Sequence, residues 1–298
     1  EEYANENSDV HNTAVNVTSV IYDSGFPWQT KKSLLNLLAH RKDTFVHLGT
    51  HDVGGMRLTA SQDYSLAVSL RAAAQLFPES EYFGTSVARA LIMGRSGKIR
   101  AHQFKKDISP LYEVAVKSSD YMGAGDGKWK AGKHFDGGPN HVLKEMYDIS
   151  VPYTSASGRI RDWDAGLNWV ESFDRSSNCF PALKTVYTDD TSVLNSYFTA
   201  MAIVEINKVC ERARRYYSGV SNLTDEQLAE RIDRFIVENT TGRFDGRFII
   251  EPNTYYTDGD KARGYSWTTQ VTIYAPSMKT VMTAYVTARR MSDYTAAA

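Results

Sequence analysis

The stretch Asn178-Cys-Phe-Pro-Ala-Leu-Lys-Thr-Val-Tyr187 opens the part of the chain that decides the fold. Helical spacing of apolar residues predicts a long helix at about 191–217 and a second helix at about 224–239. Two β-rich runs follow, at 246–251 and 264–290. No catalytic constellation interrupts this order, and unpaired strands at the end of a chain tend to pair with neighbouring chains. The segment therefore indicates a building block for assembly rather than a catalyst.

Both expected helices begin at recognisable capping residues. Thr191 or Ser192 is placed to cap the long helix, because a side-chain oxygen there can accept a hydrogen bond from the first turn. Thr224-Asp-Glu-Gln227 has capping-box spacing and predicts the start of the second helix, which ends by Gly242. The apolar face of the long helix is expected at Val193, Tyr197, Met201, Val204 and Val209.

The terminal ribbon carries the clearest strand pattern. Tyr265 to Tyr274 and Lys279 to Arg289 are rich in threonine, valine and tyrosine, and Ala275-Pro276-Ser277 lies between them as a turn. Proline is poorly placed inside a central strand and suits this bend. The pattern predicts a β-hairpin, which either pairs wholly within its own domain or completes a sheet shared with adjacent copies. We favour the shared sheet.

The first half of the chain predicts a β-α-β unit. Val15 to Tyr22 alternates as a strand, residues 30–40 have helical spacing, and Thr44 to Leu48 is a short apolar strand. Such a unit places a crossover helix on a parallel pair of strands, so we expect an α/β sheet with covering helices. Further helices are predicted from Ser61, as N-cap, to about Leu76, and from Thr85 to Met93.

Composition changes along the chain predict its division into units. Residues 1–12 are acidic and rich in asparagine, which predicts a flexible lead-in. Glycines between Met122 and Pro139 predict a surface loop. A junction near Arg159 to Asp164 separates an α/β domain at 13–164 from a C-terminal α+β domain at 165–298 that ends in the ribbon.

Charge, cysteine content and hydropathy exclude several classes of protein. A formal net charge of −1 over 298 residues gives no global attraction to nucleic acid or to an anionic membrane, so we expect neither as a partner. Cys179 and Cys210 are too few for a disulfide framework and fit buried thiols in a reducing compartment. No stretch approaches the ~20 apolar residues of a membrane helix, and the start lacks a signal-peptide layout. Because the chain begins at Glu1 without methionine, we expect a preceding segment.

A metal-dependent hydrolase is one alternative, and it rests on two histidines. His47, His51 and Asp52 stand close together directly after an expected strand, where α/β enzymes commonly place reactive groups. The spacing of the histidines suits zinc only on a helix, whereas Gly49 and Thr50 predict a loop. Hydrogen-bonded histidines are therefore the favoured interpretation.

Other motifs that resemble catalytic or ligand sites lack a required feature. Gly123-Ala-Gly-Asp-Gly-Lys128 is no phosphate loop, because tryptophan follows the lysine where serine or threonine is needed. Asp120, Asp126 and Asp136 lack calcium-hand spacing. The adjacent Asp189 and Asp190 are explained as partners of a helix N-terminus. We therefore expect no catalytic residue, no metal ligand and no cofactor.

A carbohydrate-binding or protein-binding virion module is the second alternative. The chain contains 18 tyrosines, whose rings combine apolar area with a polar tip and suit recognition surfaces. Candidates are Tyr216, Tyr217, Tyr255 and Tyr256. Tyrosines also suit packed interfaces between copies of one chain, so they do not separate this alternative from assembly.

The order of these elements resembles the C-terminal portion of tail sheath proteins from contractile phage tails and related injection machines. The resemblance spans roughly residues 15–290 and rests on Arg41-Lys-Asp43 before a buried strand, Asp164-Ala-Gly-Leu-Asn168, Leu183-Lys-Thr-Val-Tyr187 with Thr191-Ser192 before the long helix, Gly242 to Phe248, and Val271-Thr-Ile-Tyr-Ala-Pro276. Family members commonly carry a Gly-Ala-Arg-Thr-like run where this chain has Pro181-Ala-Leu-Lys-Thr185.

The resemblance implies an α/β sheath-like fold and a structural subunit without catalysis. Such a subunit forms hexameric rings that stack as a helical sleeve around an inner tube, and contraction of the sleeve drives the tube through the host envelope. It implies a location in the virion tail, with the host cytoplasm during assembly, and partners that are copies of itself and a tail tube protein. Strands exchanged between subunits are expected at Phe248, Ile250, Val271, Ile273, Val281 and Tyr285.

The C-terminal half of the long helix is basic and has two interpretations. Lys208, Arg212 and Arg215 are expected to face the tube if the resemblance holds. Positive side chains near a helix C-terminus also stabilise the helix through its dipole, which explains much of the cluster without a partner.

Overall fold

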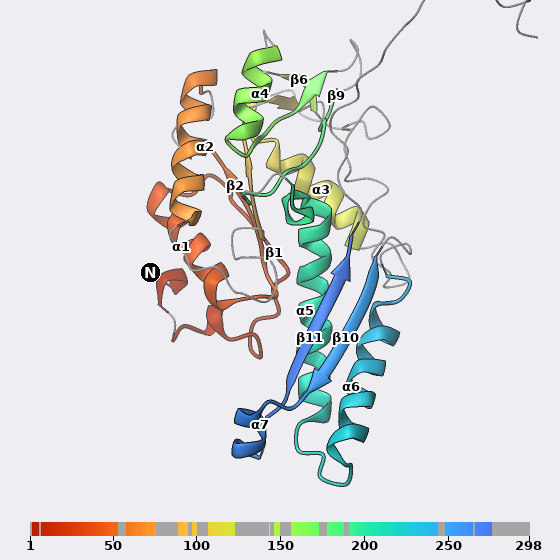
Figure 1. Cartoon of the computed structure of the whole chain (residues 1–298). Helices are drawn as coiled ribbons and strands as arrows, with labels where there is room; N and C mark the ends of the chain where they lie inside the picture. Colours follow the sequence, from red (N-terminus) through yellow and green to blue (C-terminus); the bar gives the residue numbers. More distant parts are fainter. Residues whose placement is uncertain are drawn as a thin grey trace, which may run out of the picture.

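The structure is a computed structural model that describes residues 2–5, 7–52, 58–75, 89–94, 97–99, 107–122, 143, 146–149, 156–172, 178–187, 191–243, 248–264 and 266–275. Figure 1 shows an α/β body, from which a long helix leads down into a lobe of helices and a β-ribbon. This mixed α/β architecture agrees with the fold class predicted from the sequence.

A four-stranded parallel sheet forms the centre of the body. Its strand order is β1 (Val20–Tyr22), β2 (Phe45–Gly49), β3 (Ala90–Met93) and β7 (Leu167–Asn168). Helix α1 (Trp28–His40) connects β1 to β2, which confirms the predicted β-α-β unit. Every residue of β2 is buried, as expected for a parallel strand that is covered on both faces.

Alternation along the strands divides the body into two cores. Phe45 and Leu91 point to one face of the sheet, where they pack against α3 (Leu111–Met122) and α5 (Tyr197–Tyr217). Val46 and Ile92 point to the opposite face, where they pack against α1 and α2 (Ala60–Gln75). Because successive side chains of a strand point to opposite faces, one short apolar run supplies both cores.

Two predictions in this region are wrong. The helix predicted at 85–93 conflicts with strand β3, because a short apolar run has no periodicity that separates a buried strand from a helix. The N-cap of α2 is Thr59 rather than Ser61. The Thr59 Oγ1 accepts a hydrogen bond from the Gln62 amide at 3.3 Å, and the Gln62 Oε1 accepts one from the Thr59 amide at 2.9 Å.

The start of the chain is attached to the body through a buried arginine. Arg41 is 1% exposed and donates to both carboxylate oxygens of Asp43, at 3.0 and 2.7 Å. It also donates to the carbonyl oxygens of Val10 at 2.8 Å and Asn16 at 2.7 Å. The lead-in contains the short 3₁₀ turns η1 (Glu2–Ala4) and η2 (Asp9–His11). Arg41 and Asp43 therefore hold the segment that contains Val10 and Asn16 against the body.

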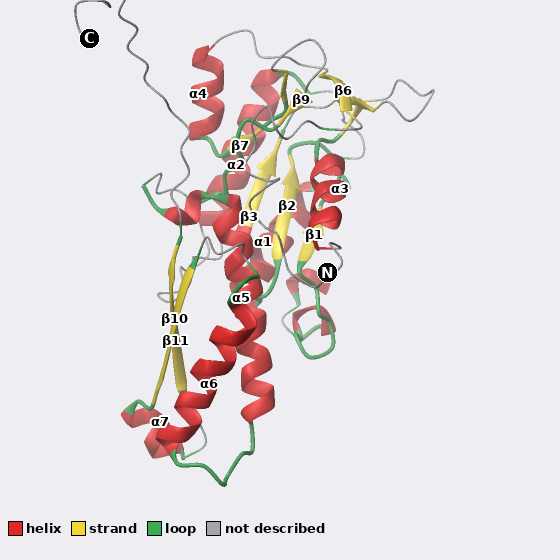
Figure 2. Cartoon of the chain, turned by 90° about the vertical axis from the view of Figure 1, so that its right-hand side faces the viewer, coloured by secondary structure: helices red, strands yellow, loops and turns green. Residues whose placement is uncertain are grey.

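Smaller elements gather at one end of the body, above the parallel sheet in Figure 2. Strands β4 (Gly97–Ile99), β5 (Asp107–Ile108) and β6 (Met146–Ile149) form an antiparallel sheet in the order β5-β4-β6. Strands β8 (Glu171–Ser172) and β9 (Asn178–Cys179) form a pair, and α4 (Ala156–Asp164) precedes β7. The glycine-rich loop predicted after Met122 lies outside the described residues.

The predicted junction after Asp164 stays a prediction, but the parallel sheet crosses it. Strand β7 pairs with β3, and Asn168 fixes the next segment to the sheet. Its Nδ2 donates to the carbonyl oxygens of Ile92 at 3.0 Å and Lys184 at 2.8 Å, and its Oδ1 accepts from the Lys184 amide at 2.7 Å. Two of the motifs behind the resemblance thus meet at one buried asparagine.

Helix α5 belongs to both parts of the molecule. Met201 and Val204 pack in the body, whereas Ile206, Val209 and Ala213 pack in a separate third core. The predicted cap of the long helix is wrong, because Ser192 caps a 3₁₀ turn, η4 (Val193–Asn195), whereas α5 itself begins after Ser196 without a side-chain cap. The predicted second helix is α6 (Asp225–Thr240), which lies beside α5 and starts at the capping box of Thr224 and Gln227. Among the described helices, none has the length and apolarity needed to cross a membrane.

Candidate assembly surface

The lobe carries a two-stranded antiparallel ribbon. Strand β10 (Ile249–Tyr255) pairs with β11 (Thr268–Tyr274) in a continuous register from Ile249↔Tyr274 to Tyr255↔Thr268. The predicted run 264–290 therefore contains β11, and the predicted run 246–251 overlaps only the start of β10, which continues to Tyr255. The described partner of β11 is β10, whereas residues 279–289, the predicted second arm of the hairpin, lie outside the described residues.

A small helix that the sequence interpretation missed fixes one end of the ribbon. Helix α7 (Asp258–Arg263) joins the two strands and begins at a capping box of Thr257 and Asp260. The Asp260 carboxylate accepts from the hydroxyls of Ser266 and Thr257, each at 2.7 Å, and of Thr268 at 2.9 Å. Hydrogen bonds from Ser266 and Thr257 hold the pKa of Asp260 well below its ordinary value, because they stabilise the charged form. The spacing Thr257 to Asp260, with a glycine at 264, was the available signal.

The ribbon has one packed face and one exposed face. Val271 is buried, and Phe248, Ile250 and Ile273 pack beside it against α5 and α6. On the opposite face, Ile249 is 62% exposed and its cross-strand partner Tyr274 is 54% exposed. Four of the residues predicted to pair between subunits therefore use their side chains within their own lobe, so any pairing with another copy would use their main chain.

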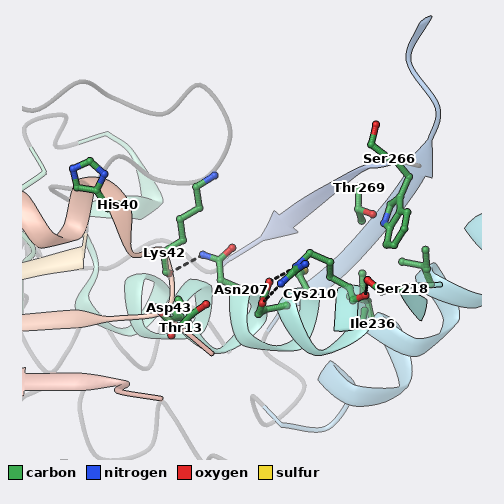
Figure 3. A pocket seen from close by; sticks show the side chains of 15 residues that line it. Thr13, His40, Lys42, Asp43, Asn207, Cys210, Ser218, Ile236, Ser266 and Thr269 are labelled. Carbon is green, nitrogen blue, oxygen red and sulfur yellow. Dashed lines mark hydrogen bonds and ion pairs between the residues drawn. The ribbon is translucent and has the colours of Figure 1, made fainter. Parts of the chain in front are cut away.

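A groove of about 510 Å³ runs beside β11, between the lobe and the body, as Figure 3 shows. Its apolar part includes Ile236 and Trp267, and its charged part includes Lys42, Glu211 and Arg214. The full lining is Thr13, His40, Lys42, Asp43, Asn207, Cys210, Glu211, Ala213, Arg214, Ser218, Ile232, Ile236, Ser266, Trp267 and Thr269. No described strand of the same chain other than β11 contributes a lining residue.

Hydrogen bonds from α5 hold the lobe against the body along this groove. The Asn207 Nδ2 donates to the Lys42 carbonyl oxygen at 3.1 Å, as drawn in Figure 3. An Arg215 nitrogen donates to the Thr13 carbonyl oxygen at 3.1 Å. Burial raises the pKa of the Cys210 thiol to about 12, so this groove residue stays protonated and unreactive at neutral pH.

The predicted tube-facing residues lie on the C-terminal half of α5 but differ in their contacts. Lys208 is bonded to Ser19 and pairs with Glu205 at 3.0 Å. Arg215 pairs with Glu211 at 3.1 Å, and Arg212 is exposed. Much of the basic cluster therefore holds parts of the chain together. That these residues face a tube stays a prediction.

The two candidate histidines, His47 within β2 and His51 just after it, are buried in the body. The buried His47 has its Nε2 2.9 Å from the Tyr197 hydroxyl, and its ring stacks on Tyr22 at 4.6 Å between centroids. Burial lowers the pKa of His47 to about 3. The buried His51 accepts a hydrogen bond from Lys31 at its carbonyl oxygen. Among the described residues, no three histidine, cysteine or acidic side chains are grouped so as to hold a metal ion.

The remaining candidate residues do not meet in one place. Tyr216 and Tyr217 pack around Phe235 at the far end of α5, with ring centroids 5.9 and 6.0 Å from it. Tyr255 ends β10, and Tyr256 follows it. The predicted positions Val281, Tyr285, Asp126, Asp136, Asp189 and Asp190 lie outside the described residues.

Comparison with known proteins finds a likeness in structure but none in sequence. No protein-family model matches the chain, and no curated protein matches it either. A chain of the anti-feeding prophage baseplate has a TM-score of 0.56 at 12% identity, and the match covers 87% of this chain and 65% of that one. The protein therefore spans less than two thirds of that relative.

Two further solved structures are similar and come from contracted sheaths. The helical sheath of the anti-feeding prophage has a TM-score of 0.52 at 12% identity, with 98% of this chain and 75% of that chain covered. The PVC sheath complex of an extracellular contractile injection system has a TM-score of 0.55 at 11% identity, with 92% and 72% covered. The chain has the fold of the sheath proteins of contractile injection systems.

Proposed function

We propose that the protein is a structural subunit of a contractile tail sheath. In this proposal its copies polymerise as a helical sleeve around an inner tube, and contraction of the sleeve drives the tube through a host envelope. The observation that carries the proposal is the ribbon: a regular strand pair, held rigidly on two helices, stands beside a groove in a sheath-like fold. The subunit would lie in the tail of the particle and assemble in the host cytoplasm.

Main-chain pairing of the ribbon in one copy with a strand of another copy would link the copies. An added strand contributes hydrogen bonds worth about 0.5–1.5 kcal/mol each, and it leaves the packed face of the ribbon undisturbed. The α/β bodies could then rotate against one another while the links persist. Contacts between bodies that differ between two states would supply the driving free energy, and small differences would add over stacked hexameric rings.

The tube would be contacted by the basic end of α5. Of the three proposed residues, Arg212 and Arg215 are exposed, and Lys208 and Arg215 also hold α5 to the body. An acidic tube surface fits this chemistry, because exposed charges steer association more than they add affinity.

Truncation and electron microscopy test the proposal. A chain that ends at residue 275 keeps β11 and the packed lobe but loses Val281 and Tyr285, the two predicted pairing residues that follow β11. We expect the full chain to form sleeves or ring stacks under negative stain, and the truncated chain to stay dispersed while its helical far-UV circular dichroism signal is retained. Normal sleeves from the truncated chain would refute strand linkage, and a full chain that is always monomeric would refute the function.

A further inference from the structure

The direction of each main-chain amide in the ribbon follows from one hydrogen bond. In an antiparallel pair, alternate residues point their N–H and C=O groups away from the partner strand. The Thr254 amide donates to the Asp233 carboxylate of α6 at 3.2 Å, so it points away from β11. Since the direction repeats every second residue, Ile250 and Pro252 point their main-chain groups to the same outer edge of β10.

The outer edge of β10 is poor in free donors. Asp233 occupies the Thr254 amide, and the same carboxylate accepts from the Thr254 hydroxyl at 2.6 Å. Pro252 has no N–H at all. Of the three outward positions in this strand, only Ile250 keeps an amide that an incoming strand can use. Proline and an acidic side chain are devices by which natural sheets protect an edge from pairing.

The outer edge of β11, in contrast, is rich in available amide donors. By the register, Thr269, Val271 and Ile273 lie opposite the three outward residues of β10 and therefore point their own main-chain groups outward. Among the described residues, none accepts a hydrogen bond from these three amides. Thr269 and Trp267 also line the groove, which leaves room for side chains of a strand beside β11.

We propose that the ribbon accepts an extended segment of a second copy along the β11 edge only, and that Pro252 and Asp233 close the β10 edge. The inference rests on the assembly function proposed above, and it adds which edge of the ribbon joins one copy to the next. Among the described residues, the β10 edge is closed, whereas the β11 edge is regular over seven residues and lies beside a groove, which favours pairing along β11. A ribbon that pairs along one edge only links the copies head to tail. An array built from such contacts extends in one direction, so the order of the copies is fixed.

Photo-cross-linking in mixed copies tests which edge is used. A photoreactive residue is placed at Thr272 or, as matched control, at its cross-strand partner Glu251, since both are exposed on the same face. Equal amounts of ¹⁴N and ¹⁵N chains are assembled, so that mass identifies links between copies. We expect links between copies from Thr272 to exceed those from Glu251 by at least about tenfold, the ratio that two lost hydrogen bonds produce.

An exchange of two residues reverses the expected pattern. The double variant Pro252→Val with Val271→Pro moves the proline across the ribbon at unchanged composition, so links should pass from Thr272 to Glu251. Val271→Ala is the control for lost packing and should keep the wild-type pattern. If the exchange impairs folding, Pro252→Val with Asp233→Ala only restores donors to β10, because alanine cannot accept from the Thr254 amide, and should add links from Glu251.

The outcomes separate this inference from the function on which it rests. Links between copies that form equally from Glu251 and Thr272, or mainly from Glu251, overturn the choice of edge and leave assembly intact. Links from Thr272 that never join a ¹⁴N chain to a ¹⁵N chain overturn the inference too. The strand beside β11 then comes from the same chain rather than from a second copy. A wild-type protein that gives no particles and no links at either position refutes the assembly function itself.

Discussion

Replacing Arg41 with methionine should destabilise the body strongly. Methionine keeps much of the apolar stem but leaves the Asp43 carboxylate without its ion pair, and the carbonyl oxygens of Val10 and Asn16 without a donor. The two ionic side chains are 1% and 10% exposed, so water cannot replace the lost contacts. Removing one partner of a buried pair costs about 3–5 kcal/mol, a large share of a typical stability of about 5–15 kcal/mol.

The assay is urea unfolding followed by circular dichroism and by tryptophan fluorescence. The matched control is Arg214→Met, because Arg214 pairs with Glu211 at 2.7 Å but is 60% exposed, and its loss should cost under about 1 kcal/mol. The double variant Arg41→Met with Asp43→Asn should lose less than the sum of its single variants, because the carboxylate left without Arg41 is then neutral. Equal costs for the Arg41 and Arg214 variants would refute the anchoring role of Arg41.

Two further predictions concern pH and helix capping. The pKa of His47 is about 3 in the folded chain and about 6.5 when unfolded, so its contribution is fully present above pH 6.5 and is lost as the pH falls toward 3, by about 1.4 kcal/mol per pH unit. The free energy of unfolding of a His47→Gln variant should therefore fall less steeply than that of the wild type between pH 6 and 4, and equal slopes would contradict this. Thr224→Ala removes the α6 capping box and should cost about 1 kcal/mol in urea unfolding, whereas Ser221→Ala, at an exposed position outside the capping box, should change nothing measurable.

Local sequence patterns predicted the helices and strands better than they predicted which strands pair with one another. The β-α-β unit and the α6 capping box could be predicted because periodicity and capping are properties of neighbouring residues. Strand β3 was mistaken for a helix because Ala90 to Met93 is apolar throughout and too short to show a period. The pairing of β10 with β11 depends on contacts across α7, which no local pattern contains.

The strands of the ribbon could be predicted from the sequence, but their use could not. The terminal β-rich runs predicted strands where β10 and β11 lie, and the basic end of α5 was recognised as a charged helix end. That this ribbon joins copies stays a prediction. The groove could not be foreseen, because its walls come from residues as distant as Thr13, Asn207 and Trp267. The meaning of Pro252 also required the register, since proline closes an edge only where its nitrogen points outward.

Amide hydrogen exchange in assembled and dissociated protein tests main-chain pairing most directly. If copies are joined through the β11 edge, the amides of Thr269, Val271 and Ile273 should exchange at least about tenfold more slowly in the assembly, while the Ile250 amide on the β10 edge stays unchanged. Unchanged exchange at all three β11 amides in an assembled sample would contradict the account.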